Sequence, residues 1–305
     1  MPGIDSYVQL RQAEDVQDVI YDISPVDNPV ASMSRTMRAT GKIHQWTEDS
    51  IAAAAANRLA EGAAAGADTS SAVTEKLNYC QIMGKVAEVT GTLEAVDKYG
   101  RDSEMAYQLE KRYKELANDE ELAIVGAPGG TRQTGTAGGP TAATARQMKS
   151  LHSQLDASVI KDAAAVTTVV NLEKMLLDAH QATWAAGGNP TYLVTDGTRA
   201  RHISAMAYSA GRTRQFGNVT SIVNVIDLYV SNYGQLDVVL DRNIDDCYLL
   251  LDFNYLATPV LRPTQDWEIA KAGDSDKRQI LRESTYAVLN SKAHAMIDNI
   301  AASLT

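Results

Sequence analysis

The chain has 305 residues, of which 45% are hydrophobic and 22% charged, and its formal net charge at pH 7 is −10. This length suffices for one large core or two modest ones. A net acidic chain does not wrap nucleic acid through its phosphates, because that binding needs clustered lysines and arginines. Two cysteines, Cys80 and Cys247, are too few for a disulfide framework. We find neither a signal peptide nor an apolar run of the roughly 18 residues that span a membrane, so we expect a protein of the cytoplasm or of something assembled there.

The first 37 residues combine an acidic stretch with two closely spaced prolines, Pro25 and Pro29. Proline fixes φ and disfavours helix in the residue before it, so this segment favours extended or turn backbone. Too few of its apolar residues recur at a regular spacing to form a packed element. The segment is therefore predicted to be an arm that lies along a surface and becomes ordered only when docked.

Two strands on either side of an alanine-rich segment predict a long hairpin. The strands are expected over residues 41–50 and 73–83, and residues 51–68 between them include a run of five alanines. Alanine favours helix, but this segment has almost nothing to bury. Because an isolated hairpin is marginally stable in water, we predict that the tip contacts another chain.

A long amphipathic helix is predicted over residues 100–125, with Asp102 or Ser103 as its N-cap. Its apolar stripe consists of Met105, Leu109, Tyr113, Leu116 and Ala123. Glu110 and Lys114 stand four residues apart, in the order that stabilises a helix. The glycines from Gly126 onward predict a flexible connection.

The middle third alternates helices and strands. One helix is expected to begin after Asn171 as its cap and to end at Gly187, and another is expected over residues 198–208. Strands are expected over residues 192–195, 221–231, 236–240 and 247–251. Helices that flank strands indicate an α/β or α+β domain.

The pattern changes again after Pro259 and Pro263. A strand is predicted over residues 267–270, followed by a turn over 273–276. Residues 277–290 then alternate for 14 positions, which is longer than an ordinary strand. Residues 293–300 are predicted to form a short helix.

Motifs for catalysis and ligand binding fail on inspection. Lys42 and Lys85 follow glycines but lack the other residues of a phosphate-binding loop. Asp196 lies in a Val-Thr-Asp-Gly-Thr run that is similar to the signature of haloacid-dehalogenase-type phosphatases. Valine stands at the nucleophile position there, so Asp196 is interpreted as a turn and cap residue. The acids from Asp241 imitate a calcium loop, but Asp246 stands where the turn needs glycine.

The five histidines show no spacing typical of metal ligands. We therefore predict no catalytic residue, no cofactor-binding residue and no metal ligand. Basic residues gather locally, as Arg199, Arg201, Arg212 and Arg214. They are interpreted either as a solvated face or as a patch that pairs with acids of a neighbouring subunit.

The order of these parts resembles the Hong Kong 97-type capsid fold of tailed phages and encapsulins. Local sequences sharpen the resemblance toward the podophage-type major capsid family typified by phage SU-ten. The opening is similar through Asp22-Ile23-Ser24-Pro25-Val26-Asp27-Asn28-Pro29 and Trp46-Thr47-Glu48-Asp49-Ser50, and the close through Gly273-Asp274-Ser275-Asp276-Lys277, Glu283-Ser284-Thr285, Asn290 and Ala293-His294.

The resemblance implies an α+β fold of the Hong Kong 97 type. Its parts would be an N-terminal arm (1–40), an extended loop (41–90), a peripheral domain with a long spine helix (91–150), an axial domain (151–262), and return strands and helix of the peripheral domain (263–305). The function implied is that of a major capsid protein and not of an enzyme. Hexamers and pentamers of the chain would form an icosahedral shell around double-stranded DNA. The alternatives are an encapsulin-like compartment shell and a hydrolase built on residues 151–262.

The resemblance also implies partners and a location. A portal protein and decoration proteins would complete a virion capsid, which is assembled in the host cytoplasm without a membrane. Because the arm begins close to Met1, any scaffolding protein is expected to be a separate chain. Residues 47–75 contain no lysine, so we expect the shell to be held non-covalently or by accessory proteins.

Overall fold

The computed structural model describes residues 28–52, 54–64, 66, 70, 72–96, 103–126, 132–139, 145–209, 228–271 and 273–304. The helices in these residues are α1 (Pro29–Met33), α2 (Gly91–Ala95), α3 (Glu104–Val125), α4 (Val169–Ala185) and α5 (Gly197–Ser209), with 3-10 turns η2 (His152–Gln154), η3 (Ala157–Val159) and η4 (Phe253–Tyr255). The strands are β1 (Arg35–Arg38), β2 (Ile43–Glu48), β3 (Thr74–Tyr79), β4 (Gln81–Thr90), β5 (Thr134–Thr136), β6 (Gln147–Lys149), β7 (Ile160–Asp162), β8 (Tyr192–Thr195), β9 (Leu228–Ser231), β10 (Gly234–Leu240), β11 (Tyr248–Leu251), β12 (Leu256–Ile269), β13 (Ser275–Ser284), β14 (Ala287–Val288) and β15 (Ala295–Asp298).

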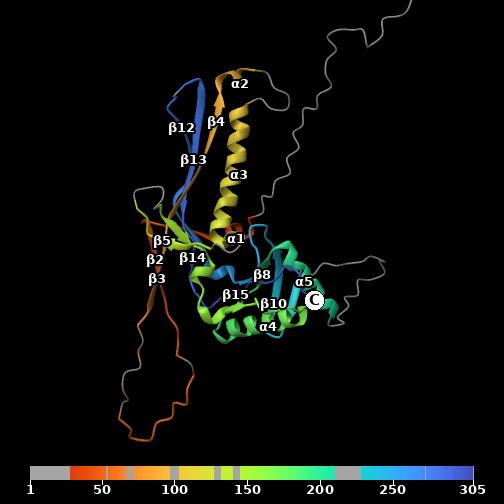
Figure 1. The fold of residues 1–305 in the computed structure, drawn as a ribbon. Helices are drawn as coiled ribbons and strands as arrows, with labels where there is room; N and C mark the ends of the chain where they lie inside the picture. The colour runs from red at the N-terminus through yellow and green to blue at the C-terminus, as the bar shows by residue number, and fades with distance from the viewer. Residues whose placement is uncertain are drawn as a thin grey trace, which may run out of the picture.

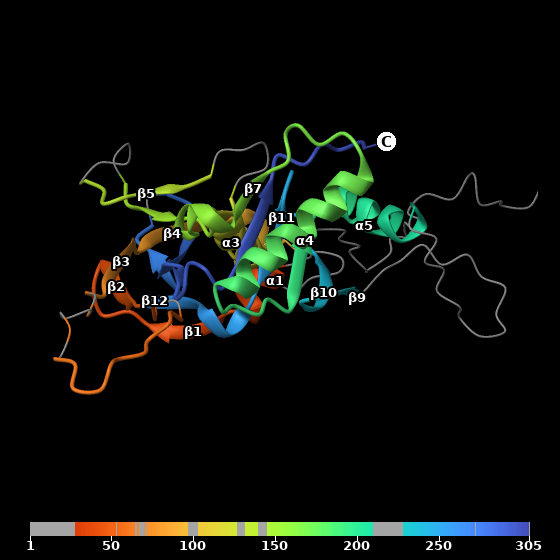
Figure 2. The same ribbon diagram turned by 90° about the horizontal axis from the view of Figure 1, so that it is seen from below.

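Two sheets organise the molecule. The first has the strand order β1-β12-β13-β4, with β14 also paired to β12, and α3 packs along β4. The second has the order β7-β15-β11-β8-β10-β9 and carries α4 and α5. Figure 1 shows the first sheet and α3 as a long upright projection, while the second sheet and its helices form a compact block to one side. Figure 2 shows α4 crossing in front of the second sheet, where it packs on β15 and β7.

The predicted long helix is confirmed as α3, and it begins at Glu104 because the Ser103 hydroxyl accepts a backbone N–H of its first turn. The pair of Glu110 and Lys114 is present at 2.8 Å. Tyr113 departs from the expected apolar stripe, since it is exposed and its hydroxyl donates to Asp266 on β12 at 2.9 Å. The stripe is fully buried only in the C-terminal half of the helix, where the two sheets meet.

The single strand expected over residues 73–83 is two strands, β3 and β4. The chain is fixed to the body between them, because Cys80 is buried and the Asn78 amide donates to the carbonyls of Tyr286 (2.6 Å) and Lys149 (3.2 Å). On one side of this anchor β3 pairs with β2, and on the other side β4 pairs with β13. The β2–β3 hairpin and β4 therefore leave the body in opposite directions (Figure 1).

The prediction of an arm that is ordered only when docked is wrong for the part of the arm that the structure describes. Pro29 is the first residue of α1, a position where proline's missing N–H and fixed φ suit a helix. Val30 is fully buried, and β1 pairs in parallel with β12 from Arg35 opposite Ala257. Residues 29–38 are thus packed elements on their own chain. Residues 1–27, which include Pro25, lie outside the described residues.

The helix predicted over residues 293–300 is wrong, because this segment forms strand β15 between β11 and β7. Its short apolar run fits a buried strand as well as a turn of buried helix, and the two neighbouring strands decide. The alternating run over 277–290 is divided into β13 and β14. The strand expected over 267–270 starts at Leu256, and Pro263 is tolerated where its register against β13 shifts, between Val260 and Gln265.

Most of the predicted elements of the middle third are confirmed. Strands over 192–195, 236–240 and 247–251 are confirmed as β8, β10 and β11, and the helix over 198–208 as α5. The strand over 221–231 is described only in its last four residues, as β9. The first long helix of this part is α4, but its cap is Thr168, whose hydroxyl accepts from the Asn171 amide, and not Asn171. Its end at Gly187, where φ is +89°, is confirmed. Within the glycine-rich connection, β5 and β6 pair.

Candidate functional site

The tip of the β2–β3 hairpin is the most exposed part of the described chain. Pairing runs from Ile43 opposite Tyr79 to Glu48 opposite Thr74 and then stops. Beyond it, all the described residues of 51–64 are exposed, and Ile51 and Leu59 keep 101% and 76% of their surface. Large aliphatic side chains that stay in water lack the stabilisation that burial gives. A tip of this composition is therefore suited to burial against another chain.

The upright projection carries a second apolar surface on the face turned away from α3. Ile82 and Val86 on β4 are each 48% exposed, and Trp267 on β12 is 41% exposed. Val86 lies opposite Gln279, which lies opposite Trp267, so these side chains share one face of the sheet. We call Ile82, Val86 and Trp267 the projection patch. The other face packs Met83 and Ile280 against α3.

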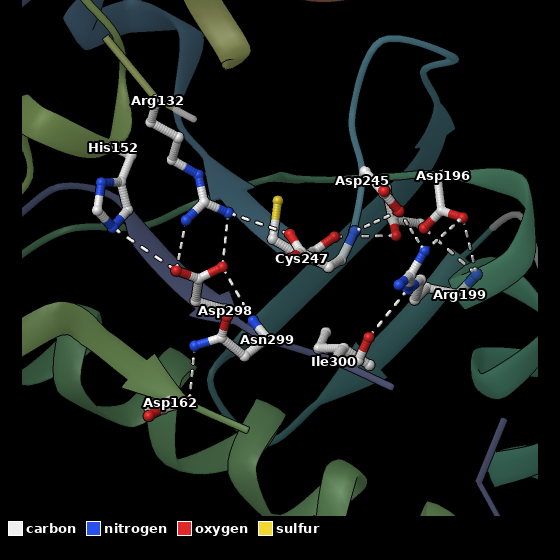
Figure 3. A network of polar contacts seen from close by, with 12 residues as sticks. Arg132, His152, Asp162, Asp196, Arg199, Asp245, Cys247, Asp298, Asn299 and Ile300 are labelled. Carbon is white, nitrogen blue, oxygen red and sulfur yellow. Dashed lines mark hydrogen bonds and ion pairs between the residues drawn. The ribbon is translucent and has the colours of Figure 1, made fainter. Parts of the chain in front are cut away.

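A network of buried charges ties together the compact block (Figure 3). Arg132 donates to both carboxylate oxygens of Asp298 at 2.5 Å and to Asp246 at 3.2 Å. The Arg132 and Asp298 side chains are each only 13% exposed. Burial is the largest influence and opposes the charge of the guanidinium, but the hydrogen bonds to Asp298 and the negative charges of Asp298 and Asp246 together outweigh it and raise the pKa of Arg132. The network thereby joins the glycine-rich connection to the last strand.

Arg199 forms the other half of the network. It donates to Asp245 at 2.5 Å, to the Ile300 carbonyl at 3.1 Å and to Asp196 at 3.4 Å. The interpretation of Arg199 as a residue that pairs with a neighbouring subunit is therefore wrong, because it is buried and paired within its own chain. Arg201 is exposed, so its pairing with a neighbouring subunit stays a prediction. Arg212 and Arg214 lie outside the described residues.

The acids that imitated ligand-binding motifs bind their own backbone. Asp196 accepts from the Thr198 amide at 2.9 Å, which confirms it as a turn and cap residue. Asp241 accepts from the Asn243 amide at 2.8 Å, and Asp252 caps η4. Within the described residues, no group of three or more His, Cys, Asp or Glu is arranged to hold a metal ion. In the same part of the chain, no helix is both long and apolar enough to cross a membrane.

One serine and histidine do meet in the block where a hydrolase was considered. The Ser231 hydroxyl lies 2.9 Å from Nδ1 of His180 and burial lowers the pKa of that imidazole. The same hydroxyl donates to the Gly234 carbonyl at 3.1 Å and accepts from the Tyr233 amide. The imidazole and the Gly234 carbonyl therefore share one hydroxyl as a hydrogen-bond partner. These contacts of Ser231 with Gly234 and Tyr233 lie within the β9–β10 turn.

Sequence reasoning missed Arg132, Asp298 and the buried acids of α3. Glu120 and Glu121 are both buried, and Glu120 pairs with Arg282 at 2.9 Å. A signal for Glu120 was present, because it continues the apolar stripe four residues after Leu116. Arg132 had no such signal, since its partner lies 166 residues away.

Comparison with known proteins gives a family for this arrangement. Residues 4–301 match the SU10 major capsid protein family. A curated relative, the major capsid protein of Escherichia phage Phieco32, is 34% identical over 104 residues, which are 34% of this chain and 30% of the relative. The chain thus spans less than a third of the length of that relative in the match.

Solved structures show the same fold at low sequence identity. The capsid asymmetric unit of cyanophage A-1(L) has a TM-score of 0.72 and 12% identity, and the match covers 97% of this chain and 98% of that one. The encapsulin SrpI of Synechococcus elongatus PCC 7942 has a TM-score of 0.62 and 9% identity, covering 99% and 98%. Gordonia phage Cozz has a TM-score of 0.62 and 15% identity, covering 97% and 93%. The α+β fold of the Hong Kong 97 type is confirmed, and the chain belongs to the SU10 major capsid protein family.

Proposed function

We propose that this chain is a major capsid protein that self-assembles, as hexamers and pentamers, into an icosahedral shell around double-stranded DNA. The observation that carries the proposal is the pair of projections that leave the compact block in opposite directions, each with exposed apolar side chains. In a shell, neighbouring copies of the subunit would bury both surfaces. Obligate interfaces of this kind bury about 2,000–5,000 Å².

The parts of the chain take the roles that the resemblance implied. Residues 1–40 are the arm, 41–90 the extended loop, 91–150 the peripheral domain with α3 as its spine helix, 151–262 the axial domain, and 263–305 the return. One refinement follows from the strand pairing, since β4 pairs with β13 along its whole length and therefore moves with the peripheral domain. The hinge of the extended loop is then at Cys80.

The chain acts by geometry and not by catalysis, inside a virion capsid assembled in the host cytoplasm. Its net charge of −10 suits a wall that encloses DNA without reading its sequence. A separate scaffolding protein, a portal and decoration proteins are the expected partners. An encapsulin-like compartment is the second candidate, favoured by the fold likeness to SrpI. Purified shells that hold a cargo enzyme in place of DNA distinguish it.

Expression of the full chain and of a variant that lacks residues 54–64 tests the proposal. The full chain is expected to sediment as closed shells. The shortened chain is expected to keep its circular dichroism spectrum and unfolding midpoint but to sediment as small species, because the tip makes no contact that its own fold requires. Shells from the shortened chain, or a full chain that stays monomeric with and without a scaffolding protein, would contradict the proposal.

A further inference from the structure

A basic surface lies at the base of the upright projection. Arg35 and Arg38 are exposed on β1, the edge strand of the first sheet, and Lys42 is exposed four residues further on. Figure 2 shows β1 at the margin of the molecule beside β12, with which it pairs. Among the residues that the structure describes, no carboxylate pairs with any of these three side chains. We call Arg35, Arg38, Lys42 and Arg262 the basic patch.

Arg262 belongs to this patch because its own acid is shared with a second arginine. Glu283 on β13 has a side chain only 4% exposed, and it accepts from Arg146 at 2.5 Å and from Arg262 at 2.7 Å. Two guanidinium groups on one carboxylate leave one positive charge uncompensated. Arg262 presents that charge to solvent, because its side chain is 49% exposed and donates to Glu283 through Nε.

Strand register spreads the basic patch across the width of the sheet. One row of paired residues runs from Arg38 on β1 across β12 and β13 to Gln81 on β4. Lys42 lies at the β4 end of this row, where its carbonyl accepts the Cys80 amide at 2.9 Å. Arg262 lies in the next row. Three strand spacings of about 4.8 Å make the row roughly 14 Å wide, so the cations form a band that suits an extended acidic segment.

The segment that complements this charge stands just before it in the chain. Residues 1–27 hold six acids and one arginine, so their side chains carry a net charge of −5. The acids gather in one stretch, as Glu14, Asp15, Asp18 and Asp22. Opposite charges on two surfaces steer them together and set their register.

The point at which the arm joins the body is fixed close to the patch. Glu121 on α3 accepts the backbone amides of Val30 and Ala31, each at 2.8 Å, and β1 follows directly after α1. The ten residues from Asn28 to Arg38 include the five of α1 and span at most roughly 25 Å.

The acids of the arm can reach back over this distance. Asp22 and Glu14 precede Asn28 by six and fourteen residues, which correspond to roughly 20 and 46 Å of extended chain. A short flexible tether gives an effective concentration on the order of millimolar. In unassembled subunits, docking within one chain is therefore favoured over docking between two.

We propose that the acidic stretch of residues 14–22 docks on the basic patch of its own subunit before assembly. The inference deepens the proposed function and rests on it in one respect, since an arm held on its own subunit is withheld from neighbouring copies until a shell forms. The docking itself is a property of the single chain. It is therefore tested in unassembled subunits, whether or not shells form.

Two introduced cysteines test the docking in the full-length, unassembled chain. Gln17→Cys stands among the acids in the sequence and Thr40→Cys at an exposed position of the patch, whereas the native cysteines are buried. With oxidised glutathione, the expected product is a disulfide within one chain, seen as a monomer of faster mobility in a non-reducing gel. Gln17→Cys with Ala164→Cys, which is exposed on the compact block, is the control and should react more slowly. Equal rates for the two pairs, or disulfide-linked dimers as the main product at Thr40, would overturn the proposal.

Charge reversal separates attraction from mere proximity. The patch is reversed by Arg35→Glu, Arg38→Glu and Lys42→Glu, and the arm by Glu14→Lys, Asp15→Lys, Asp18→Lys and Asp22→Lys. Reversal of the patch should slow the disulfide at Thr40 by about fivefold, because several exposed ion pairs act together. Reversal of the arm in the same chain should restore the rate, which damage to the fold would not allow.

Circular dichroism first shows that each variant is folded, and Lys42→Glu alone stands in if the triple variant is not. Lys174→Glu, exposed on α4, is the matched control and should leave the rate unchanged. A rate that reversal of the arm does not restore would overturn the proposal. So would a rate that reversal of the patch leaves unchanged while binding to a DNA duplex is lost, because the patch would then serve the genome.

Discussion

Glu48, the last residue of β2, accepts two hydrogen bonds from Ser291, one from its backbone amide at 2.6 Å and one from its hydroxyl at 2.7 Å. Lys76 on the paired strand adds an ion pair to Glu48 at 3.5 Å. The contact joins the tip-side end of the paired β2–β3 hairpin to the segment before β15. It lies beside a cavity of about 430 Å³ that Glu48, Lys76 and Ser291 help to line. The angle of the loop is thus fixed by few bonds, which new neighbours can replace.

Replacement of Glu48 should loosen the extended loop. Glu48→Ala leaves both groups of Ser291 without this acceptor, which costs about 1.5–3 kcal/mol of unfolding free energy for hydrogen bonds to a charged group. Hydrogen exchange over β2 and β3 should accelerate, while that over β11 should not. Glu75→Ala, at an exposed position of the same hairpin, is the control and should have little effect. Equal effects of the two substitutions would remove the role of Glu48 as a latch.

The pair of Arg132 and Asp298 should be the costliest charged contact to break. Arg132→Leu leaves a buried carboxylate without its partner, with an expected loss of about 3–5 kcal/mol in urea unfolding of the unassembled chain. Arg132→Lys keeps the charge but not the two-pronged geometry. Its loss of stability should therefore be smaller than that of Arg132→Leu. Lys114→Ala, which breaks the exposed pair with Glu110, should cost about 0.3–0.5 kcal/mol. A loss at Arg132 as small as at Lys114 would contradict the account.

Two arginines of the same helix should behave differently. Arg199→Ala should destabilise the subunit by about 1–3 kcal/mol, because Asp196 and the Ile300 carbonyl lose their donor. Arg201→Ala should leave stability within about 0.5 kcal/mol, since its side chain is exposed. If Arg201 pairs with a neighbouring copy, its replacement should reduce the salt sensitivity of shell assembly. Light scattering at several salt concentrations measures this, and unchanged sensitivity would leave Arg201 a solvated residue.

Acid should weaken the fold through His294. Its Nδ1 accepts the Asp252 amide at 3.2 Å, and burial lowers its pKa from 6.5 to about 3. Because the unfolded chain binds the proton and the folded chain does not, stability is fully present above pH 6.5 and falls as the pH drops toward 3. The slope should reach about 1.4 kcal/mol per pH unit. His294→Asn, which retains an acceptor, should reduce this slope between pH 4 and pH 6, and urea unfolding at each pH measures the difference.

The sequence allowed good prediction of elements whose signals are local. The stripe and cap of α3, the apolar run of β8, and the glycine that ends α4 each carry their own pattern. The misassigned segments depend on distant partners instead. Residues 295–298 form a strand because β7 and β11 lie on either side of them, and residues 73–83 are divided because Asn78 is fixed to Tyr286, 208 residues away.

The same distinction applies to the charged residues. Asp196 was interpreted correctly because its amide partner is two residues away. Arg199 resembled a surface arginine because its carbonyl acceptor, Ile300, is 101 residues away. Glu121 is likewise separated from Val30 by 91 residues. Buried charge is decided by tertiary contacts, so one sequence without relatives does not reveal it.

Electron cryo-microscopy of particles formed by the full chain tests the central claim most directly. The account predicts a closed icosahedral shell of hexamers and pentamers in which the tip of the extended loop, residues 51–64, lies against a neighbouring copy. The projection patch should also be covered by a neighbouring copy. A chain that forms no shell, or a shell in which both surfaces face solvent, would contradict it.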